Sequence, residues 1–412
     1  MTSGRALSGV ERIWLTADRL APPFVNQLVL EAPTGDLGAV DWSAAVAAAA
    51  AAVPDLSVRL RGVLGWTRWA PGPPPRLVRI VGSDWDGASG GGAPFLARAL
   101  DPRTGPVAEL VVVEGSTPRL VLRTHHAVTD GQGTLAFARA LVAAARGEPP
   151  IPVPPSATTD ADLAAELGAI PETPPAADCP SPLGPAVDAP LGVRWVRARV
   201  DGAGRRLLPR AITALASRAR ADRAAVRIDV PVDLRRHRPS PPSTANLTGL
   251  VRLPVGRLLA ETEPSEAVGS ALRAALADTE EARFPLVPAV VRWLPLWLME
   301  RIARKGAIQA LATGRFSTSG TVSNLGRLDL AALAVPGFTP HRAFFIPPGS
   351  PALPVFLTLT GDDEGVTLCA SAPLALAANG RLEALMDDLV GRLAQGAPRD
   401  QSGHPVTRRG TP

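Results

Sequence analysis

The chain has 412 residues, of which 46% are hydrophobic and 20% are charged. This composition is typical of a globular protein with one large core or two ordinary ones, and it excludes a disordered chain. The net charge is +5, and we expect no nucleic-acid partner because no dense basic run is interleaved with aromatic residues.

Strands and helices are predicted to alternate through the first third of the chain. A helix is expected over residues 41–52, because alanine dominates this stretch and Asp41 can cap its start. Residues 107–113 and 119–124 are expected to form a hairpin around a Gly-Ser-Thr-Pro turn. The other expected elements are strands within 56–69 and at 76–81, a helical turn at 94–100, and a helix at 135–145.

Residues 147–190 differ in composition from the rest, since they are dense in Pro, Ala and Asp, with a short helical island at 161–167. We therefore predict a first lobe at 1–150, a Pro-rich crossover linker at 151–190 and a second lobe at 191–412. For the second lobe we expect strands at 193–200, at 225–232 and within 344–374, and helices at 205–220, 265–283 and 381–393. The alternation predicts a mixed α/β fold.

Two of the five histidines are adjacent in the stretch HHAVTDG, which runs from His125 to Gly131. It follows a predicted strand and precedes a predicted helix, with Gly131 and Gly133 available for a sharp turn. The unperturbed pKa of histidine lies near neutrality, so a histidine here can accept a proton and return it. Asp130 can anchor the loop or orient the ring, directly or through an arginine.

A structural role and a metal site are the alternatives for this stretch. A lone histidine is more often structural than catalytic, whereas a pair at a strand end followed by Asp-Gly is consistent with either role. His-His-Asp also has the ligand types that a metal needs, but His237, His341 and His404 stand alone and no second cluster completes the coordination sphere. We therefore expect no metal and no resident cofactor.

The stretch HHAVTDG resembles the HHxxxDG motif of the chloramphenicol acetyltransferase-like superfamily. That superfamily includes nonribosomal peptide condensation domains, polyketide-associated acyltransferases, wax ester synthases and alcohol acyltransferases. Further segments along the whole chain are similar to segments of its members: LSGVERIW at 7–14, PDLSVRL at 54–60, DVPVDLR at 229–235 with NLTG at 246–249, and TVSNLG at 321–326.

Two of these segments differ from a family pattern. In PDLSVRL, Asp55 follows Pro54 where the superfamily has a His-Pro pair. The segment TVSNLG resembles the SNxxG turn of the acyltransferase branches, and it stands where peptide condensation domains have DFGWG.

The resemblance implies two chloramphenicol acetyltransferase-like lobes, each a mixed sheet flanked by helices, arranged as a V with the histidine in a tunnel between them. It implies an acyltransferase that moves an acyl group from a coenzyme A or carrier-protein thioester to a small-molecule hydroxyl or amine, in natural-product or lipid biosynthesis. His126 would take the proton of the acceptor and return it to the leaving thiolate, while Asp130 holds the loop. Neither a covalent acyl-enzyme nor a metal is required.

The resemblance also implies supporting residues around this pair. Arg235 becomes a candidate partner of Asp130 across the lobe interface. A hydroxyl near Asn246, from Ser243, Thr244 or Thr248, is a candidate donor to a tetrahedral oxyanion. Asn324 and Gly326 are expected to shape a turn at the tunnel. The supporting residues are thus His125, Gly131, Arg235, Asn246, Thr248, Ser323 and Asn324.

Two other functions stay open at this point. One is a condensation-type enzyme that forms an amide or cyclises a carrier-bound substrate; the SNLG segment in place of DFGWG counts against it. The other is a non-catalytic protein of the same fold that recognises a carrier protein; the intact HHxxxDG motif counts against it.

Three further features receive smaller roles. Cys179 and Cys369 are too few for a disulfide framework and are expected to be inert. The first residues lack the basic, apolar and small-residue pattern of a secretory signal, so we expect a cytoplasmic protein. Residues 286–302 are apolar but interrupted by Pro, Arg and Glu, so no membrane span is expected. A helix packed into the second lobe is favoured there over a wall for a lipophilic acyl chain or an interfacial lipid contact.

Overall fold

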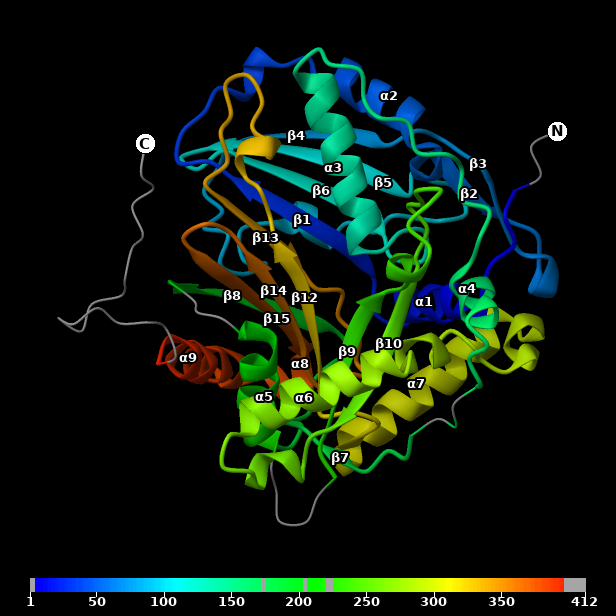
Figure 1. Ribbon diagram of the computed structural model, residues 1–412. Helices are drawn as coiled ribbons and strands as arrows, with labels where there is room; N and C mark the ends of the chain where they lie inside the picture. The colour runs from blue at the N-terminus through cyan, green and yellow to red at the C-terminus, as the bar shows by residue number, and fades with distance from the viewer. Residues whose placement is uncertain (1–3, 172, 174, 203–205, 220–224, 396–412) are drawn as a thin grey trace.

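The structure is a computed structural model that describes residues 4–171, 173, 175–202, 206–219 and 225–395. Figure 1 shows two lobes, one above the other, each built on its own β-sheet and covered by helices. The predicted mixed α/β organisation in two lobes is confirmed. Within the described ranges, no helix is both long enough and apolar enough to cross a bilayer.

The first lobe contains a sheet of strand order β13-β1-β6-β5-β4. Its neighbours are antiparallel except β4 and β5, which are parallel. Helices α2 and α3 cover one face and bury Leu28, Leu122 and Phe137 in a common core. The bounds are β1 (Val25–Glu31), α2 (Trp42–Ala52), β4 (Arg76–Ser83), β5 (Ala108–Gly115), β6 (Arg119–His125), α3 (Gly131–Ala145) and β13 (Arg342–Ile346).

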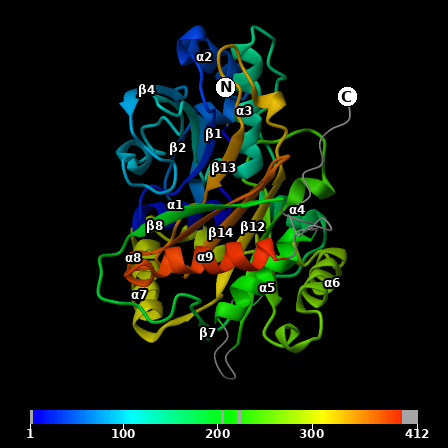
Figure 2. The same cartoon turned by 90° about the vertical axis from the view of Figure 1, so that its left-hand side faces the viewer.

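The second lobe contains a sheet of strand order β10-β9-β12-β14-β15-β8. Helices α5, α6 and α9 cover one of its faces, as Figure 2 shows for α5 and α9. The bounds are β8 (Val193–Asp201), α5 (Leu207–Ala219), β9 (Arg227–Asp233), β10 (Thr248–Pro254), α6 (Pro264–Ala277), β12 (Gly320–Arg327), β14 (Phe356–Gly361), β15 (Gly365–Pro373) and α9 (Arg381–Ala394).

Smaller elements surround these sheets. They are α1 (Gly9–Leu20), the hairpin of β2 (Val58–Arg61) and β3 (Arg68–Pro71), α4 (Asp160–Glu166), β7 (Cys179–Pro180), α7 (Leu296–Thr313), β11 (Arg315–Phe316) and α8 (Leu374–Ala377). Short 3-10 turns include Leu64–Trp66, Pro94–Ala97, Glu280–Arg283 and Ala289–Trp293. Helix α1 begins with a capping box, in which Ser8 and Glu11 satisfy each other's backbone N–H groups.

One strand crosses between the lobes. Strand β13 follows β12 of the second sheet in the chain, yet it pairs with β1 at the edge of the first sheet. Phe344 and Ile346 of β13 consequently pack beside Val29 and Val121. Residues 342–346, which the sequence-based division places in the second lobe, therefore complete the sheet of the first lobe.

Three predicted elements differ in extent or environment. The helix expected at 135–145 begins at Gly131, because the Asp130 side chain caps it. The helix expected at 265–283 ends at Ala277, since Thr279 has a left-handed backbone (φ 51°) and starts a separate 3-10 turn. The apolar stretch 286–302 is a 3-10 turn followed by α7, which packs against α1 of the first lobe. Leu286, Ala310 and Leu311 pack on second-lobe residues, so this segment contacts both lobes. The ends of the predicted helix 205–220, and His404, lie outside the described residues.

Candidate active site

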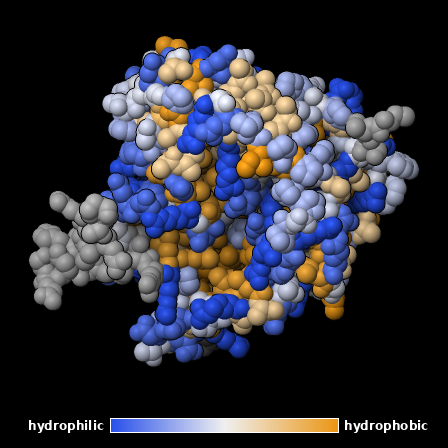
Figure 3. Space-filling model, turned by 45° about the horizontal axis from the view of Figure 1, so that its top comes forward, coloured by the Kyte–Doolittle hydropathy of each residue, from blue (hydrophilic) through white to orange (hydrophobic). Residues whose placement is uncertain are grey.

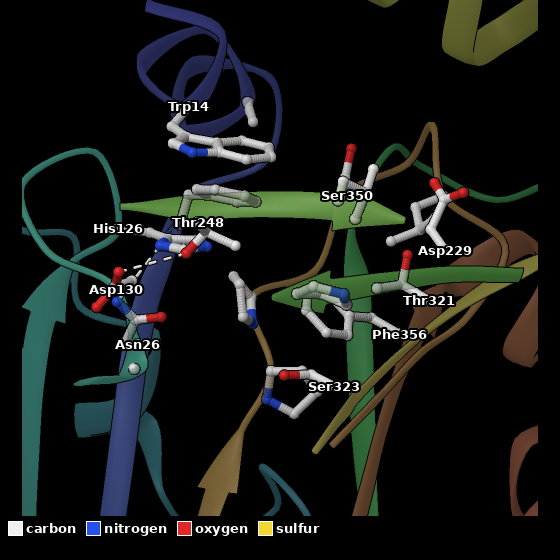
Figure 4. A pocket seen from close by; sticks show the side chains of 18 of the residues that line it. Trp14, Asn26, His126, Asp130, Asp229, Thr248, Thr321, Ser323, Ser350 and Phe356 are labelled. Atoms are coloured by element: carbon white, nitrogen blue, oxygen red, sulfur yellow. Dashed lines mark hydrogen bonds between the residues drawn. The ribbon is translucent and has the colours of Figure 1, made fainter. Parts of the chain in front are cut away.

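His126 lies at the end of β6, where the chain leaves the first sheet. Its backbone N–H donates to the Phe24 carbonyl (3.1 Å), and the next residues turn back so that Val128 and Thr129 donate to the His125 carbonyl. The imidazole ring packs against the rings of Trp14 and Phe24, each with its centroid 5.3 Å away. Figure 4 shows Trp14 of α1 reaching over the histidine at one end of a cavity. The ring is thus held in place and half-buried.

The hydrogen bonds around His126 favour one tautomer. Nδ1 lies 3.2 Å from the Thr129 carbonyl oxygen, which can only accept. The side-chain amides of Asn26 and Asn246 come within 3.4 and 3.3 Å of the same nitrogen. Each amide has a closer acceptor, the Thr129 carbonyl for Asn26 (2.8 Å) and the His126 carbonyl for Asn246 (2.6 Å). Nδ1–H donating to Thr129 therefore fits best, and it leaves the Nε2 lone pair for the cavity.

The surroundings also keep this imidazole neutral. Burial lowers the pKa of His126 to about 4, because desolvation disfavours the charged ring more than the Thr129 carbonyl and the Asp130 carboxylate favour it. A histidine with this pKa is in its basic form throughout the neutral pH range. It can receive a proton only transiently and returns it readily, as a general acid–base catalyst must.

Asp130 borders the cavity, but its carboxylate is held by groups of the second lobe. Its carboxylate accepts a bidentate pair of hydrogen bonds from Arg235 (2.9 and 3.1 Å), and further bonds from the backbone N–H groups of Gly133 (3.0 Å) and Leu247 (2.9 Å). Burial alone would raise the pKa of Asp130, but the Arg235 charge and these hydrogen bonds outweigh burial and lower it. The carboxylate is therefore charged and bound by groups of the protein.

Arg235 is held at the start of a 3-10 turn that follows β9. Its guanidinium also donates to Asp233 (2.8 Å) and to the carbonyl oxygens of Ser243 (2.8 Å) and Ala245. The contact expected between Arg235 and Asp130 is present, and it joins the histidine loop of the first lobe to the second lobe. The ion pair is largely buried, so solvent screens it weakly.

His125 faces the opposite way from His126 and is fully buried. Its Nδ1 accepts a hydrogen bond from the Ala127 N–H (3.1 Å), and its Nε2 lies 3.6 Å from a carboxylate oxygen of Asp18. The other oxygen of Asp18 accepts from the Phe24 N–H (2.9 Å). These contacts keep His125 within the framework of the loop and away from the cavity.

Gly131 and Gly133 are both part of α3 and do not form the turn expected before it. A Cβ atom on Gly133 would lie 2.4 Å from the backbone carbonyl oxygen of Thr244, and one on Gly131 would lie 2.8 Å from the Leu325 side chain. The glycines therefore allow the first turn of α3 to approach the second lobe closely. This approach brings Asp130 within reach of Arg235.

The three candidate hydroxyls, those of Ser243, Thr244 and Thr248, occupy different positions relative to the cavity. Thr248 lines the cavity, and its Oγ1 lies 3.3 Å from Asp130. The Ser243 hydroxyl contacts Ser156 and the Thr244 hydroxyl donates to Asp55, in a network behind the site. Of the three, Thr248 alone lies on the cavity surface.

Ser323 and Asn324 also line the cavity, but they lie in strand β12 and not in a free turn. Pairing with β14 is regular up to Asn324 and becomes irregular between Asn324 and Arg327. The Asn324 side chain accepts a hydrogen bond from the Gly326 N–H (3.1 Å), and Gly326 has a positive φ of 78°. The SNLG segment is therefore a strand with a bulge at the cavity wall.

The cavity beside His126 has a volume of about 540 Å³ and receives side chains from both lobes. Figure 3 shows a hollow in one face of the molecule, with a hydrophobic floor between hydrophilic rims. The apolar lining comes mainly from Leu20, Phe24, Leu250, Phe284, Phe345, Ile346, Leu353 and Phe356. A cavity of this size and character suits a lipophilic chain of moderate length.

Other reactive groups lie away from this cavity. Cys179 and Cys369 are buried as free thiols, and burial raises the pKa of both, so neither is held as a reactive thiolate. Across the described ranges, no three His, Cys, Asp or Glu side chains are grouped so as to hold a metal ion. The expectation that the protein works without a metal stays a prediction.

Sequence reasoning gave no role to several residues that contact His126. Asn26, Phe24 and Thr129 each touch its ring or loop, and Trp14 belonged only to a segment of family resemblance. Asn26 had a detectable signal, because a polar residue next to the apolar residues of 25–30 needs a buried partner. Thr129 acts through its backbone carbonyl, which leaves no signal in the sequence.

Comparison with known proteins gives structural matches alone. No protein-family model and no curated protein matches the chain. The starter condensation domain of rhizomide synthetase RzmA, a mutant in complex with C8-CoA and Leu-SNAC, is similar with a TM-score of 0.64 and 15% identity, over 98% of this chain and 96% of that one. The first condensation domain of the calcium-dependent antibiotic synthetase gives 0.62 and 16% identity, over 96% of both chains.

The condensation domain of the monacolin K polyketide synthase MokA is also similar, with a TM-score of 0.58 and 15% identity over 95% of this chain and 97% of that one. The similarity extends over nearly the full length of each chain and so includes both lobes. The chain therefore has the two-lobed fold of condensation domains, the fold of the superfamily that its motifs resemble.

Proposed function

We propose that this protein is an acyltransferase that moves an acyl group from a thioester to a hydroxyl or amine acceptor, with His126 as the general base. The observation that carries the proposal is the neutral imidazole at the wall of an interlobe cavity, with Nδ1 turned to the Thr129 carbonyl and Nε2 left for substrate. Coenzyme A and a carrier protein are the two thioester sources that we propose to test.

The reaction needs one proton relay. Nε2 of His126 takes the proton of the acceptor as the acceptor's oxygen or nitrogen bonds to the thioester carbonyl carbon. The carbonyl oxygen becomes an oxyanion. The Thr248 hydroxyl donates to the Asp130 carboxylate (3.3 Å) in the structure, and it is the candidate donor to the oxyanion once it rotates toward the cavity. When the oxyanion collapses, the carbon–sulfur bond breaks, and the imidazolium gives its proton to the thiolate. The acyl group thus passes directly to the acceptor, and no bond to the enzyme forms.

Asp130, Arg235 and Asn246 are positioning residues in this proposal. Asp130 and Arg235 fix the loop against the second lobe, and Asn246 holds the His126 carbonyl (2.6 Å). Because all three act through the loop, they contribute by keeping Nε2 in line with the acceptor. None of them needs to contact the substrate.

The substrate class follows from the cavity lining. Aliphatic and phenylalanine side chains dominate the wall, which favours a lipophilic acyl group. One similar structure is described as a complex with C8-CoA, which supports testing medium-chain donors first. Amide formation on a carrier-bound substrate is the second candidate, and the full-length likeness to condensation domains favours it. The two candidates differ in whether the acceptor is a free small molecule or a carrier-bound substrate, and they share the use of His126.

The test is thiol release from a panel of acyl-coenzyme A and acyl-carrier donors, each offered with and without alcohols, amines and an aminoacyl thioester. We expect release that depends on the acceptor, and mass spectrometry of the protein without acceptor should show no acyl adduct. An acyl group trapped on a serine or cysteine would contradict direct transfer. No release from any donor with any acceptor would favour the non-catalytic alternative.

A further inference from the structure

Seven of the ten exposed large hydrophobic side chains in the described part of the chain lie in two segments that contact each other. Each of the seven is between 48% and 65% exposed, and they come from the turn before β3 and from the segment that leads into and includes α7. They are Val63, Trp66, Val290, Trp293, Trp297, Ile302 and Ile308. We call this set the α7 surface. Such a cluster marks an interaction site, whereas single exposed hydrophobic residues do not.

The α7 surface is built on fixed contacts. The Trp66 and Trp293 rings meet edge to face with centroids 5.2 Å apart, and Arg292 donates to the Gly65 carbonyl (3.0 Å). The buried Arg12 of α1 donates to the carbonyls of Leu64 (3.0 Å) and Val291 (3.1 Å) and so ties the two segments together. The tryptophans are therefore presented by a rigid framework, although their side chains are exposed.

Helix α7 alternates apolar and basic residues along its outer side. Trp297, Arg301, Arg304 and Ile308 are separated by four, three and four positions, so they share one face of the helix. All four are exposed. The opposite face includes Ala303, which lines the cavity of His126. In Figure 1 this helix runs along the lower lobe close to α1.

The charged side chains of this region are almost all positive. Residues 58–72 and 284–316 together carry eight arginine or lysine residues and a single acidic residue, Glu300. Glu300 is already paired with Arg19 (2.9 Å) and Arg304 (3.1 Å). The chain's only lysine, Lys305, is exposed on the same helix. The α7 surface is therefore apolar and aromatic with an excess of positive charge around it.

We propose that the α7 surface docks the protein on an anionic lipid bilayer. Indole rings are favoured at the boundary between headgroups and acyl chains, and arginine and lysine beside them attract anionic headgroups. Both preferences are satisfied if α7 lies in the membrane plane. Trp297 and Ile308 would then be inserted, and the charged groups at headgroup level would be Arg301, Arg304 and Lys305. The inner face of α7 would then place the cavity wall next to the membrane, where lipophilic molecules are concentrated. The docking does not depend on the acyl-transfer proposal.

The experiment is flotation of the full chain with vesicles of phosphatidylcholine alone and of phosphatidylcholine mixed with phosphatidylglycerol. We expect binding to the mixed vesicles that weakens as salt rises, with a blue shift of tryptophan fluorescence as the indoles leave water. The Trp297→Ser variant should bind at least about tenfold less well, and Trp293→Ser with Trp297→Ser less still, because inserted aromatic area is lost. Arg301→Glu with Lys305→Glu should remove the preference for phosphatidylglycerol.

The controls are Val81→Ser and Ile151→Ser, which remove apolar side chains that are more exposed than Trp297 but lie outside the α7 surface, and which should leave binding unchanged. Circular dichroism checks the fold of each variant, and Trp297→Ser is an exposed change of small expected cost. Failure to float with either vesicle overturns the proposal. It is also overturned if the control variants bind as poorly as Trp297→Ser, or if charge reversal abolishes binding while both tryptophan variants bind normally. In the last case an acidic protein, such as a carrier, becomes the better occupant.

Discussion

The two ends of the loop between β6 and α3 have opposite environments. At one end His126 reaches a cavity lined by side chains of both lobes, and at the other end Asp130 has its carboxylate bound by Arg235 and backbone N–H groups of the second lobe. Burial lowers the pKa of His126 by disfavouring its charge, whereas the Arg235 charge lowers the pKa of Asp130 by favouring its charge. A neutral base is thus held in place by a charged anchor four residues away.

Removing the base should have the largest effect on turnover. We expect His126→Ala to lower kcat by about 100- to 10,000-fold, the usual contribution of a positioned acid–base group, while the protein stays folded. The measurement is thiol release with the best donor and acceptor, with circular dichroism as the check on folding. His341→Ala is a matched control, because that histidine lies outside the cavity lining and bonds the Glu31 carbonyl. Turnover close to wild type in His126→Ala would remove this residue from the mechanism.

Removing the anchor should damage both activity and stability. Asp130→Asn removes the more buried of the two carboxylates that pair with Arg235 and leaves Asp233, so we expect the free energy of unfolding to fall by about 1–3 kcal/mol. Loss of loop position should lower kcat by about 100-fold, with a smaller change in KM. Thermal melting and steady-state kinetics measure the two effects.

Arg235→Lys is the companion variant for the anchor. It keeps the charge and loses the bidentate geometry, and we expect an intermediate phenotype. If Asp130→Asn inactivates the enzyme without any loss of stability, Asp130 acts on the substrate and the anchoring role is wrong.

The pH dependence of activity should report the titration of His126. Because the pKa of His126 is lowered to about 4, kcat/KM should stay constant from neutral pH to about pH 5 and fall with an apparent pKa near 4. The stability of the fold should change in the same direction. The folded state favours the neutral ring, so His126 contributes its full stability above the ordinary pKa of about 6.5. This stability is lost as the pH falls toward 4. Circular dichroism across the same pH range distinguishes titration from unfolding.

Trp14→Ala sharpens this prediction. Removing the indole that packs on the imidazole admits water, so the acid limb should move upward toward about 6.5, the ordinary pKa of histidine. An acid limb near pH 6.5 already in the wild-type protein would show that His126 is better hydrated than this arrangement implies.

The sequence predicted the local parts of this site better than the distant ones. The order of strand, histidine pair, Asp-Gly and helix could be predicted because it lies within about thirty consecutive residues. The pairing of β13 with β1 joins residues more than three hundred positions apart, and no local pattern specifies it. The role of Gly133 depends on the Thr244 carbonyl of the other lobe, so the sequence suggested a turn where the structure has a close approach.

The SNLG segment shows the same limit. Its Ser-Asn-Leu-Gly composition is typical of a turn, yet pairing with β14 makes it a strand with a bulge, because tertiary contacts override local propensity. The resemblance to a known superfamily indicated Arg235, which no spacing argument could have found. The carbonyl of Thr129 and the amide of Asn26 became visible only once the loop and β1 were placed together.

The neighbouring histidine gives the smallest expected effect on turnover. His125 is buried, and its Nδ1 accepts the Ala127 N–H inside the loop, so His125→Ala leaves this donor unpaired and opens a small cavity. We expect a loss of about 1–3 kcal/mol in the free energy of unfolding. His125→Asn, whose Oδ1 can replace Nδ1 as the acceptor, should recover part of that loss. Because the ring does not face the cavity, kcat at a temperature where both variants are folded should stay within about tenfold of wild type, far above the residual kcat of His126→Ala. If His125→Ala instead abolishes turnover with unchanged stability, His125 and not His126 is the general base, contrary to what their environments indicate.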